Sequence, residues 1–185
     1  WGDPGLPDLH GMYWSSSNDF TEAMYYRLAQ AVSFSNSFIK NASELSGDEV
    51  SVFIAEARFL RAYAYYNLLD LYGNVPLTTE ISTELPTQSN RTELFNFIES
   101  ELMEIESTLL TSNEYGRVDN IAANALLSRL YLNSEAWTGQ DRYADCITYS
   151  QNVINSGYSL NMNDANGNGT AYDELFMADN DVNGA

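Results

Sequence analysis

Aromatic and amide side chains gather near the N-terminus in a pattern typical of sugar-binding surfaces. Trp14 and its neighbour Tyr13 lie in a polar, Ser-rich turn and off every apolar stripe, and Trp1 precedes them. Flat aromatic faces can stack on the C–H-rich faces of pyranose rings, and loops often carry binding residues. The side chains of Asn18 and Asp19 could bond the sugar hydroxyls. We predict a ligand-binding site at these five residues; the alternative is a loop that its aromatics pin to the core.

A second group of oxygen-bearing side chains lies near the C-terminal end. Asp164, Asn166 and Asn168 are followed by Gly169, and this spacing can aim three oxygen ligands at one hard cation. An EF-hand loop needs an acidic residue at its twelfth position, which here is Leu175. The sequence therefore allows a structural Ca²⁺ site, but it favours an Asn/Gly-rich surface turn. No other cofactor is expected.

The remaining candidate residues do not form a catalytic pattern. His10 is the only histidine and Cys146 the only cysteine, and neither has an identifiable nucleophile or base partner. Glu56, Arg58 and Arg61 lie in an apolar stretch, where buried charges must be paired, so we expect them to tie their helix to its neighbours. The other carboxylates fall mostly on outward helix faces. We therefore predict that the protein is not an enzyme.

The charge balance restricts the partners further. The chain has 26 acidic and 8 basic residues, for a formal net charge of -18. Nucleic-acid binding relies on Lys and Arg, and anionic membrane surfaces repel such a protein. Neutral ligands are not repelled by the negative electrostatic potential of such a protein. No stretch approaches the roughly 20 apolar residues of a transmembrane helix.

Apolar periodicity predicts an all-α fold. Helices are expected at about 19–42, 48–72, from 90 onward, at about 118–133 and at about 141–156. The second of these is apolar on two sides, which indicates a helix packed between neighbours. We predict tetratricopeptide-like stacked helical hairpins, an α-α superhelix, over 19–160. A turn-rich segment (1–18) precedes this array and a loop-rich tail (161–185) follows it.

Two finer predictions concern the ends and faces of these helices. Asn90 and Glu93 have the spacing of a capping box at the start of the third helix, whose outward face is expected to carry Glu99, Glu104 and Glu106. The last helix is expected to bury a stripe and to be capped by Gly157. That stripe comprises Tyr143, Ile147, Ser150 and Ile154.

One long stretch resembles a known family. The segment 56–80, EARFLRAYAYYNLLDLYGNVPLTTE, is an aromatic helix that stops at Gly73 and leaves through an extended Asn-Val-Pro exit. With the helical segment 93–110 and the segment 154–160, INSGYSL, it is similar to the SusD/RagB family. The resemblance covers about residues 20–180. Family members are longer, with a lipid-anchored cysteine upstream and a loop-rich C-terminal half. We therefore expect residues 1–185 to be the N-terminal helical domain of an incomplete SusD-like fold, without that half.

The resemblance implies a function and a location. It implies a non-enzymatic, lipid-anchored outer-membrane protein at the cell surface, which captures oligosaccharide or polysaccharide. It also implies delivery of that glycan to a partner TonB-dependent, SusC-like transporter. Two alternatives stay open: a helical protein-interaction scaffold without its own ligand site, and a glycosidase of the helical-array type.

Overall fold

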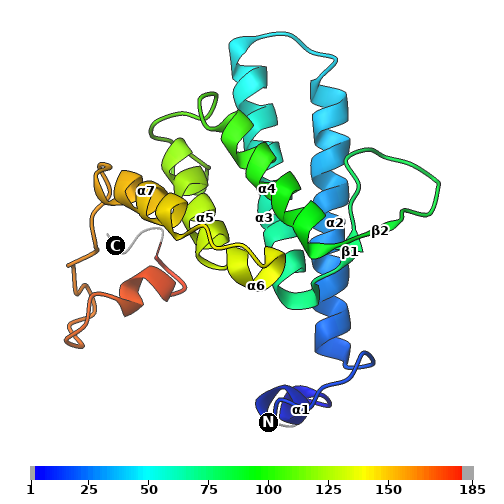
Figure 1. Ribbon diagram of the computed structural model, residues 1–185. Helices are drawn as coiled ribbons and strands as arrows, with labels where there is room; N and C mark the ends of the chain where they lie inside the picture. Colours follow the sequence, from blue (N-terminus) through cyan, green and yellow to red (C-terminus); the bar gives the residue numbers. More distant parts are fainter. Residues whose placement is uncertain (1–2, 181–185) are drawn as a thin grey trace.

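The computed structural model describes residues 3–180, so Trp1 lies outside the described residues. The described residues form seven α-helices, one short antiparallel sheet and a single 3₁₀ turn (Figure 1). The elements are α1 (Leu6–His10), α2 (Asp19–Ala42), α3 (Asp48–Tyr72), β1 (Val75–Pro76), β2 (Gln88–Ser89), α4 (Arg91–Ile105), α5 (Asn120–Leu132), α6 (Ser134–Thr138), α7 (Tyr143–Ile154) and η1 (Asp173–Phe176). The mostly helical prediction is confirmed.

Local capping explains where the long helices begin and end. The side chain of Asn18 accepts hydrogen bonds from the amides of Phe20 and Thr21 at the start of α2. The predicted capping box opens α4, with Asn90 and Glu93 each accepting the other's backbone N–H at 3.0 and 2.9 Å. Gly73 ends α3 at a φ of 76° and donates its N–H to the Leu69 carbonyl.

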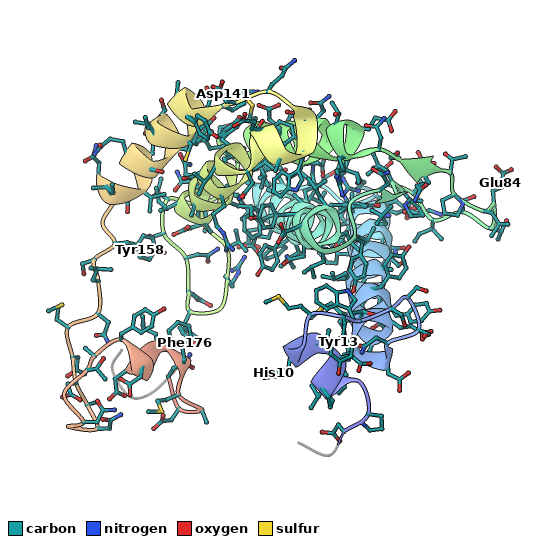
Figure 2. The ribbon with its side chains drawn as sticks, turned by 60° about the horizontal axis from the view of Figure 1, so that its bottom comes forward. His10, Tyr13, Glu84, Asp141, Tyr158 and Phe176 are labelled. Atoms are coloured by element: carbon teal, nitrogen blue, oxygen red, sulfur yellow. The ribbon has the colours of Figure 1, made fainter. Side chains whose placement is uncertain are left out.

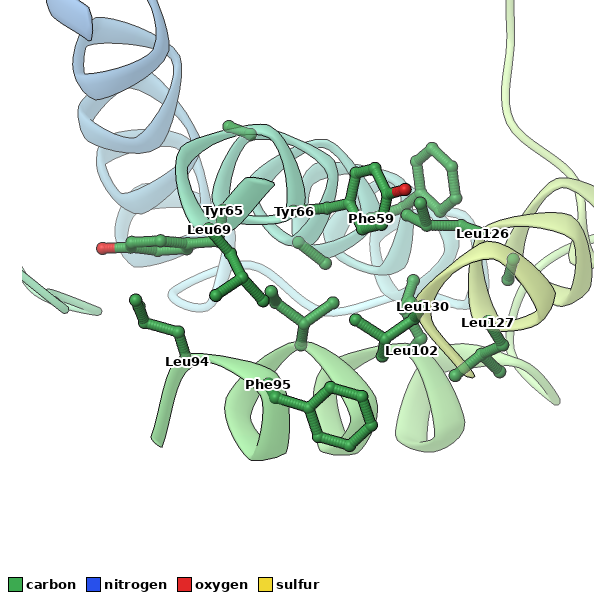
Figure 3. Packing of buried hydrophobic residues seen from close by; sticks show 14 of the residues in the cluster. Phe59, Tyr65, Tyr66, Leu69, Leu94, Phe95, Leu102, Leu126, Leu127 and Leu130 are labelled. Atoms are coloured by element: carbon green, nitrogen blue, oxygen red, sulfur yellow. The ribbon is translucent and has the colours of Figure 1, made fainter. Parts of the chain in front are cut away.

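The core forms where α3 packs between α2 and α4 and where α5 closes over α4. The short turn at residues 43–47 makes α2 and α3 an antiparallel pair (Figure 1). Side chains from three helices converge in the centre, among them Leu69, Leu102 and Leu130 (Figure 3). Tyr65 and Tyr131 are almost completely buried with them. The prediction that α3 is covered on two sides is therefore confirmed.

The structure adds short elements that periodicity does not reveal. The N-terminal segment, predicted to be irregular, contains the five-residue helix α1 with Pro7 in its first turn. The segment between α3 and α4 contains β1 and β2. These two strands pair in an antiparallel manner, and Val75 lies opposite Ser89. A further helix, α6, replaces the expected loop before α7, and its Trp137 packs edge-on against Tyr66. Elements of two to five residues are too short to show an apolar period.

The predicted inward stripe of α7 is wrong at Tyr143, Ile147 and Ile154, and correct at Ser150, which faces α5. Ile147 and Ile154 are 69% and 70% exposed, and Tyr143 also faces outward. The face of α7 that meets α5 is instead partly polar, because the Ser128 and Ser150 hydroxyls lie 2.6 Å apart there. An apolar stripe shows which side of a helix is hydrophobic, but it does not show whether another element covers that side.

Two further expectations need correction. Helix α7 ends at Ile154 with Asn155 at its C-cap, so Gly157 does not cap it. Glu99 is not simply solvated: its Oε1 accepts hydrogen bonds from the Tyr131 hydroxyl at 2.7 Å and from Arg142 Nη2 at 2.9 Å. These partners come from α5 and from the start of α7, which the local sequence around Glu99 does not indicate. Over residues 3–180, the helices all fall short of the length and apolar character that crossing a membrane requires.

Candidate functional site

A groove of about 1040 Å³ lies between the N-terminal segment and the adjoining ends of α2 and α3. Its walls combine apolar and aromatic side chains with a polar margin. The apolar and aromatic residues are Leu9, Trp14, Phe20, Met24, Tyr25, Tyr26, Leu71 and Tyr72. The polar residues are Ser15, Ser16, Ser17, Thr21 and Glu22. Ligand sites commonly have this composition, in which a mostly apolar surface carries a few polar groups.

The groove exists because Asn18 fixes the N-terminal segment to α2. Its Nδ2 donates to the Gly5 carbonyl at 3.0 Å, while its Oδ1 caps the helix. Gly5 has a φ of 89°, and a Cβ on it would lie 2.9 Å from Asn18 Nδ2. Only glycine adopts this conformation readily and leaves room for the amide. The contact therefore holds α1 and the Ser-rich turn at the foot of α2 (Figure 2).

Tyr25 and Tyr72 form the inner wall of the groove, and Tyr26 lies beside Tyr25 with most of its surface exposed. The Tyr25 ring meets the Tyr72 ring edge-on at 5.3 Å and the Tyr26 ring at 6.0 Å. The Tyr72 hydroxyl donates to the Thr21 carbonyl at 2.5 Å, which ties the end of α3 to the first turn of α2. Burial raises the pKa of the Tyr72 phenol above its ordinary value.

Trp14 is one groove residue that is suited to contact a flat ligand. Its side chain is 51% exposed although it belongs to a loop with ordered contacts, such as the 2.9 Å contact between the Ser15 and Ser17 hydroxyls. An indole face can cover the C–H face of a sugar ring, and the serine hydroxyls and the Glu22 carboxylate can bond its hydroxyl groups. The arrangement is suited to binding a neutral polyol.

The structure separates the other residues predicted for this site. Tyr13 is exposed and packs over Gly11, where a Cβ would lie 2.0 Å from the tyrosine ring. Asp19 is exposed on the first turn of α2, and neither residue lines the groove. Asn18 is buried, and its amide positions backbone groups as described above. Of the predicted residues, Trp14 lines the groove and Tyr13 and Asp19 do not. Asn18 does not line the groove either, but its side chain holds the segment that does.

Sequence reasoning missed the helical residues of the groove. Phe20, Met24, Tyr25 and Tyr72 lie in long apolar helices, where their type indicates core packing. One signal could have found some of them: Phe20 and Met24 occupy the first two turns of α2, directly after the Ser-rich turn that carries Trp14. A loop that folds back on the helix that follows it must cover the first turns of that helix.

The Asn/Gly-rich loop uses its oxygens to bond its own backbone. Both carboxylate oxygens of Asp164 accept amide N–H groups, from Asn168 at 3.1 Å and Gly169 at 2.9 Å. Asn166 Oδ1 also accepts from Asn168 N, and the buried Glu174 accepts from Asn166 N at 2.8 Å. Within residues 3–180, no group of three or more His, Cys, Asp or Glu side chains is arranged to hold a metal ion. These contacts favour a hydrogen-bonded turn, and we propose no calcium-dependent step.

The charged residues of α3 have the structural role that the sequence predicts. Glu101 of α4 is buried between Arg58 and Arg61, whose Nη2 atoms lie 2.6 and 2.5 Å from its two carboxylate oxygens. Glu56 pairs with Arg117 at 2.7 Å. The expectation that these residues tie α3 to its neighbours is confirmed. All five lie outside the groove.

Comparison with known proteins places the chain in a family. Residues 10–132 match a SusD-like family described as "Starch-binding associating with outer membrane". The chain is 39% identical over 180 residues to the starch-binding protein SusD of Bacteroides thetaiotaomicron, a match that covers 96% of this chain and 31% of that protein.

Solved structures show the same fold. A SusD superfamily protein from Parabacteroides distasonis is 27% identical with a TM-score of 0.76, over 83% of this chain and 36% of that one. A laminarin-binding SusD-like protein is 25% identical with a TM-score of 0.72, over 88% of this chain and 36% of that one. The chain therefore spans about a third of the length of these relatives, and it belongs to the SusD-like family.

Proposed function

We propose that this chain is the helical part of a glycan-binding protein that captures oligosaccharide at the cell surface, with Trp14 as the aromatic contact. The observation that carries this proposal is the groove itself. It presents a half-exposed indole beside serine hydroxyls and one carboxylate, over a wall of tyrosines. Tyr13 and Asp19 do not line the groove; we propose that they contact a ligand that extends beyond it.

The relatives favour a glucan as the ligand class. The relative with 39% identity is named a starch-binding protein, and one of the structural relatives is named for binding laminarin. Both names refer to neutral polymers of glucose, which a chain of charge -18 does not repel. We propose that the bound ligand is a starch-type oligosaccharide, with laminarin as the comparison ligand.

We further propose a role in uptake at the outer membrane. In this role a lipid anchor holds the intact precursor at the cell surface, and the protein passes its glycan to a partner TonB-dependent transporter. The family description, which names association with the outer membrane, supports the location. The partner and the anchor are inferences from the family resemblance.

The groove favours binding over hydrolysis. Glycoside hydrolysis generally uses two carboxylates placed on either side of the bond to be cleaved. Among the described residues that line the groove, Glu22 is the one carboxylate. We therefore propose that the protein releases its glycan unchanged, which a reducing-sugar assay with starch would test.

Calorimetric titration with maltoheptaose tests the proposed contact. Replacing Trp14 with alanine should weaken binding by about 1–3 kcal/mol, the range for truncating an aromatic at an interface. The thermal stability should change little, because the side chain is half exposed. Phe34→Ala is the matched control, since Phe34 is an exposed aromatic on α2 that does not line the groove.

The alternative role of Trp14 has a different signature. If the indole mainly anchors the N-terminal segment to the core, Trp14→Ala should cost about 3–5 kcal/mol of stability, as large core truncations do. Unchanged affinity for maltoheptaose together with a large drop in melting temperature would reject the proposed contact.

A further inference from the structure

Met12 has a backbone conformation that residues other than glycine rarely adopt. Its φ is 56°, and every other non-glycine residue within residues 3–180 has a negative φ. A residue with a β-carbon is crowded in this left-handed region, so it is found there only where the surrounding contacts hold it. The Met12 side chain is 82% exposed, so its own packing does not explain the conformation.

Backbone hydrogen bonds hold Met12 at the end of α1. The Met12 amide donates to the Leu9 carbonyl at 3.2 Å, and the Tyr13 amide donates to the Asp8 carbonyl at 3.1 Å. These two bonds form a Schellman motif, in which the residue after the C-cap is left-handed and is usually glycine. Here the glycine lies one residue too early, because Gly11 is the C-cap with a φ of -80°. The left-handed position therefore falls on Met12.

The turn at Met12 determines how the chain leaves α1 and approaches the groove. A left-handed residue at this position stops the helix and turns the chain in a new direction. Two residues later the chain reaches Trp14, which lines the groove together with Leu9 of α1. The contact between Asn18 and Gly5 fixes the same segment from its other side (Figure 2). The segment is thus held at two points, and Met12 is the point nearer to Trp14 in the sequence.

We propose that Met12 is a positioning residue for glycan binding, because its left-handed backbone directs the Trp14 indole into the groove. The inference rests on the proposed function, which supplies the ligand, and it adds a residue that acts through Trp14. Met12 does not line the groove, so its side chain is not the contact. The position therefore requires a particular φ and not a particular side chain. Residues that tolerate a positive φ should replace Met12, and β-branched residues should not.

Calorimetric titration of variants at position 12 with maltoheptaose tests this assignment. Glycine adopts the left-handed conformation readily and asparagine tolerates it, so Met12→Gly and Met12→Asn should bind within about twofold of the unaltered protein. Valine is strongly disfavoured there, so Met12→Val should break the turn and raise the dissociation constant about fivefold or more. Met162→Val is the matched control, because Met162 is a similarly exposed methionine without a positive φ and outside the groove.

A double variant shows whether Met12 acts through Trp14. If it does, adding Met12→Val to Trp14→Ala should not weaken binding further, because the contact that the turn positions is already absent. A residue with only a general structural role would instead give losses that add. The melting temperature of each variant should stay close to that of the unaltered protein, because α1 contributes no buried residue to the core.

The outcomes separate this inference from the proposed function. If Met12→Val binds maltoheptaose as tightly as the unaltered protein while Trp14→Ala binds weakly, the positioning role is wrong and the glycan contact stands. Met12→Gly binding as weakly as Met12→Val would also overturn the inference, because the side chain and not φ would then matter. Additive losses in the double variant would overturn it as well. If the unaltered protein does not bind maltoheptaose, both the positioning role and the proposed contact are wrong.

Discussion

Aromatic residues have opposite roles in the helical array and in the groove at its end. Tyr65 and Tyr131 are buried, and their hydroxyls bond Thr78 and Glu99. Trp14 keeps half of its surface exposed at the margin of the groove. Buried aromatics whose polar atoms are satisfied stabilise packing, whereas a half-exposed one on an anchored loop is available to a ligand. Exposure and hydrogen bonding, rather than residue type, therefore distinguish the two roles.

The array and the groove also differ in how charge is used. The array buries Glu101 between two arginines, so that each charge is compensated. The groove has Glu22 at its margin, where an acceptor is open to a ligand's hydroxyl groups. If this division is correct, changes in the array should alter stability without altering glycan affinity, and changes in the groove should do the reverse.

The largest effect is expected at Glu101. Glu101→Ala leaves Arg58 and Arg61 without their shared buried partner and should destabilise the fold by about 3–5 kcal/mol. Glu104→Ala is the control, because Glu104 also pairs with Arg58 but is exposed, and it should cost at most about 1 kcal/mol. Urea unfolding measures both. Similar losses of stability in the two variants would show that burial does not determine how much the Glu101 ion pairs contribute to stability.

A smaller effect on both properties is expected at Asn18, which joins the two regions. Asn18→Ala removes the cap of α2 and should cost about 0.5–2 kcal/mol of stability. It also frees the N-terminal segment at Gly5, so affinity for maltoheptaose should fall, though less than for Trp14→Ala.

The variant Asn18→Asp separates the two functions of this side chain. Aspartate retains the cap but cannot donate to the Gly5 carbonyl. Because the second carboxylate oxygen would face the Gly5 carbonyl oxygen, calorimetry should show weakened binding even though the cap of α2 is kept. Full affinity in the aspartate variant would mean that the contact with Gly5 does not shape the groove.

The smallest effect is expected from alkaline pH, and it concerns the array. Burial raises the pKa of Tyr65 and of Tyr131, and the hydrogen bond to Glu99 raises the pKa of Tyr131 further. A phenol whose pKa is raised on folding contributes stability that is complete below its unfolded pKa of about 10 and is lost as pH rises through the folded value. Urea unfolding should therefore give a constant contribution up to about pH 9 and a decline above about pH 10.

The contribution of one phenol can be isolated by substitution. Tyr65→Phe removes a titrating group, so the free energy of unfolding should fall less steeply above about pH 10 in this variant. Tyr63→Phe is the control, because Tyr63 lies on the exposed side of the same helix. An identical alkaline decline in the Tyr65 variant and the unaltered protein would contradict the assigned role of Tyr65.

The sequence predicted the long helices well because their ends carry strong local signals. The Asn90–Glu93 capping box and Gly73 each act within a few residues, so their effect can be predicted without knowing the fold. The pairing of Arg58 and Arg61 could also be predicted in kind, since charges in an apolar helix need partners. The partner itself, Glu101, comes from α4 and could not be named.

The groove was only partly predictable for a related reason. Trp14 was identifiable because a large aromatic in a Ser-rich turn does not fit core packing. Tyr25 and Tyr72 have helical spacing, and the same spacing serves a core or the wall of a groove. The exposed stripe at Ile147 and Ile154 shows the same limit, because periodicity cannot tell a covered face from an open one.

The most direct test of the proposed glycan site is a crystal structure of the protein with maltoheptaose. We expect a glucose ring stacked on the Trp14 indole within the groove, with sugar hydroxyls bonded to the serine turn or to Glu22. A sugar bound elsewhere, with the Trp14 face free of ligand at saturating oligosaccharide, would contradict the assignment of this groove as the glycan site.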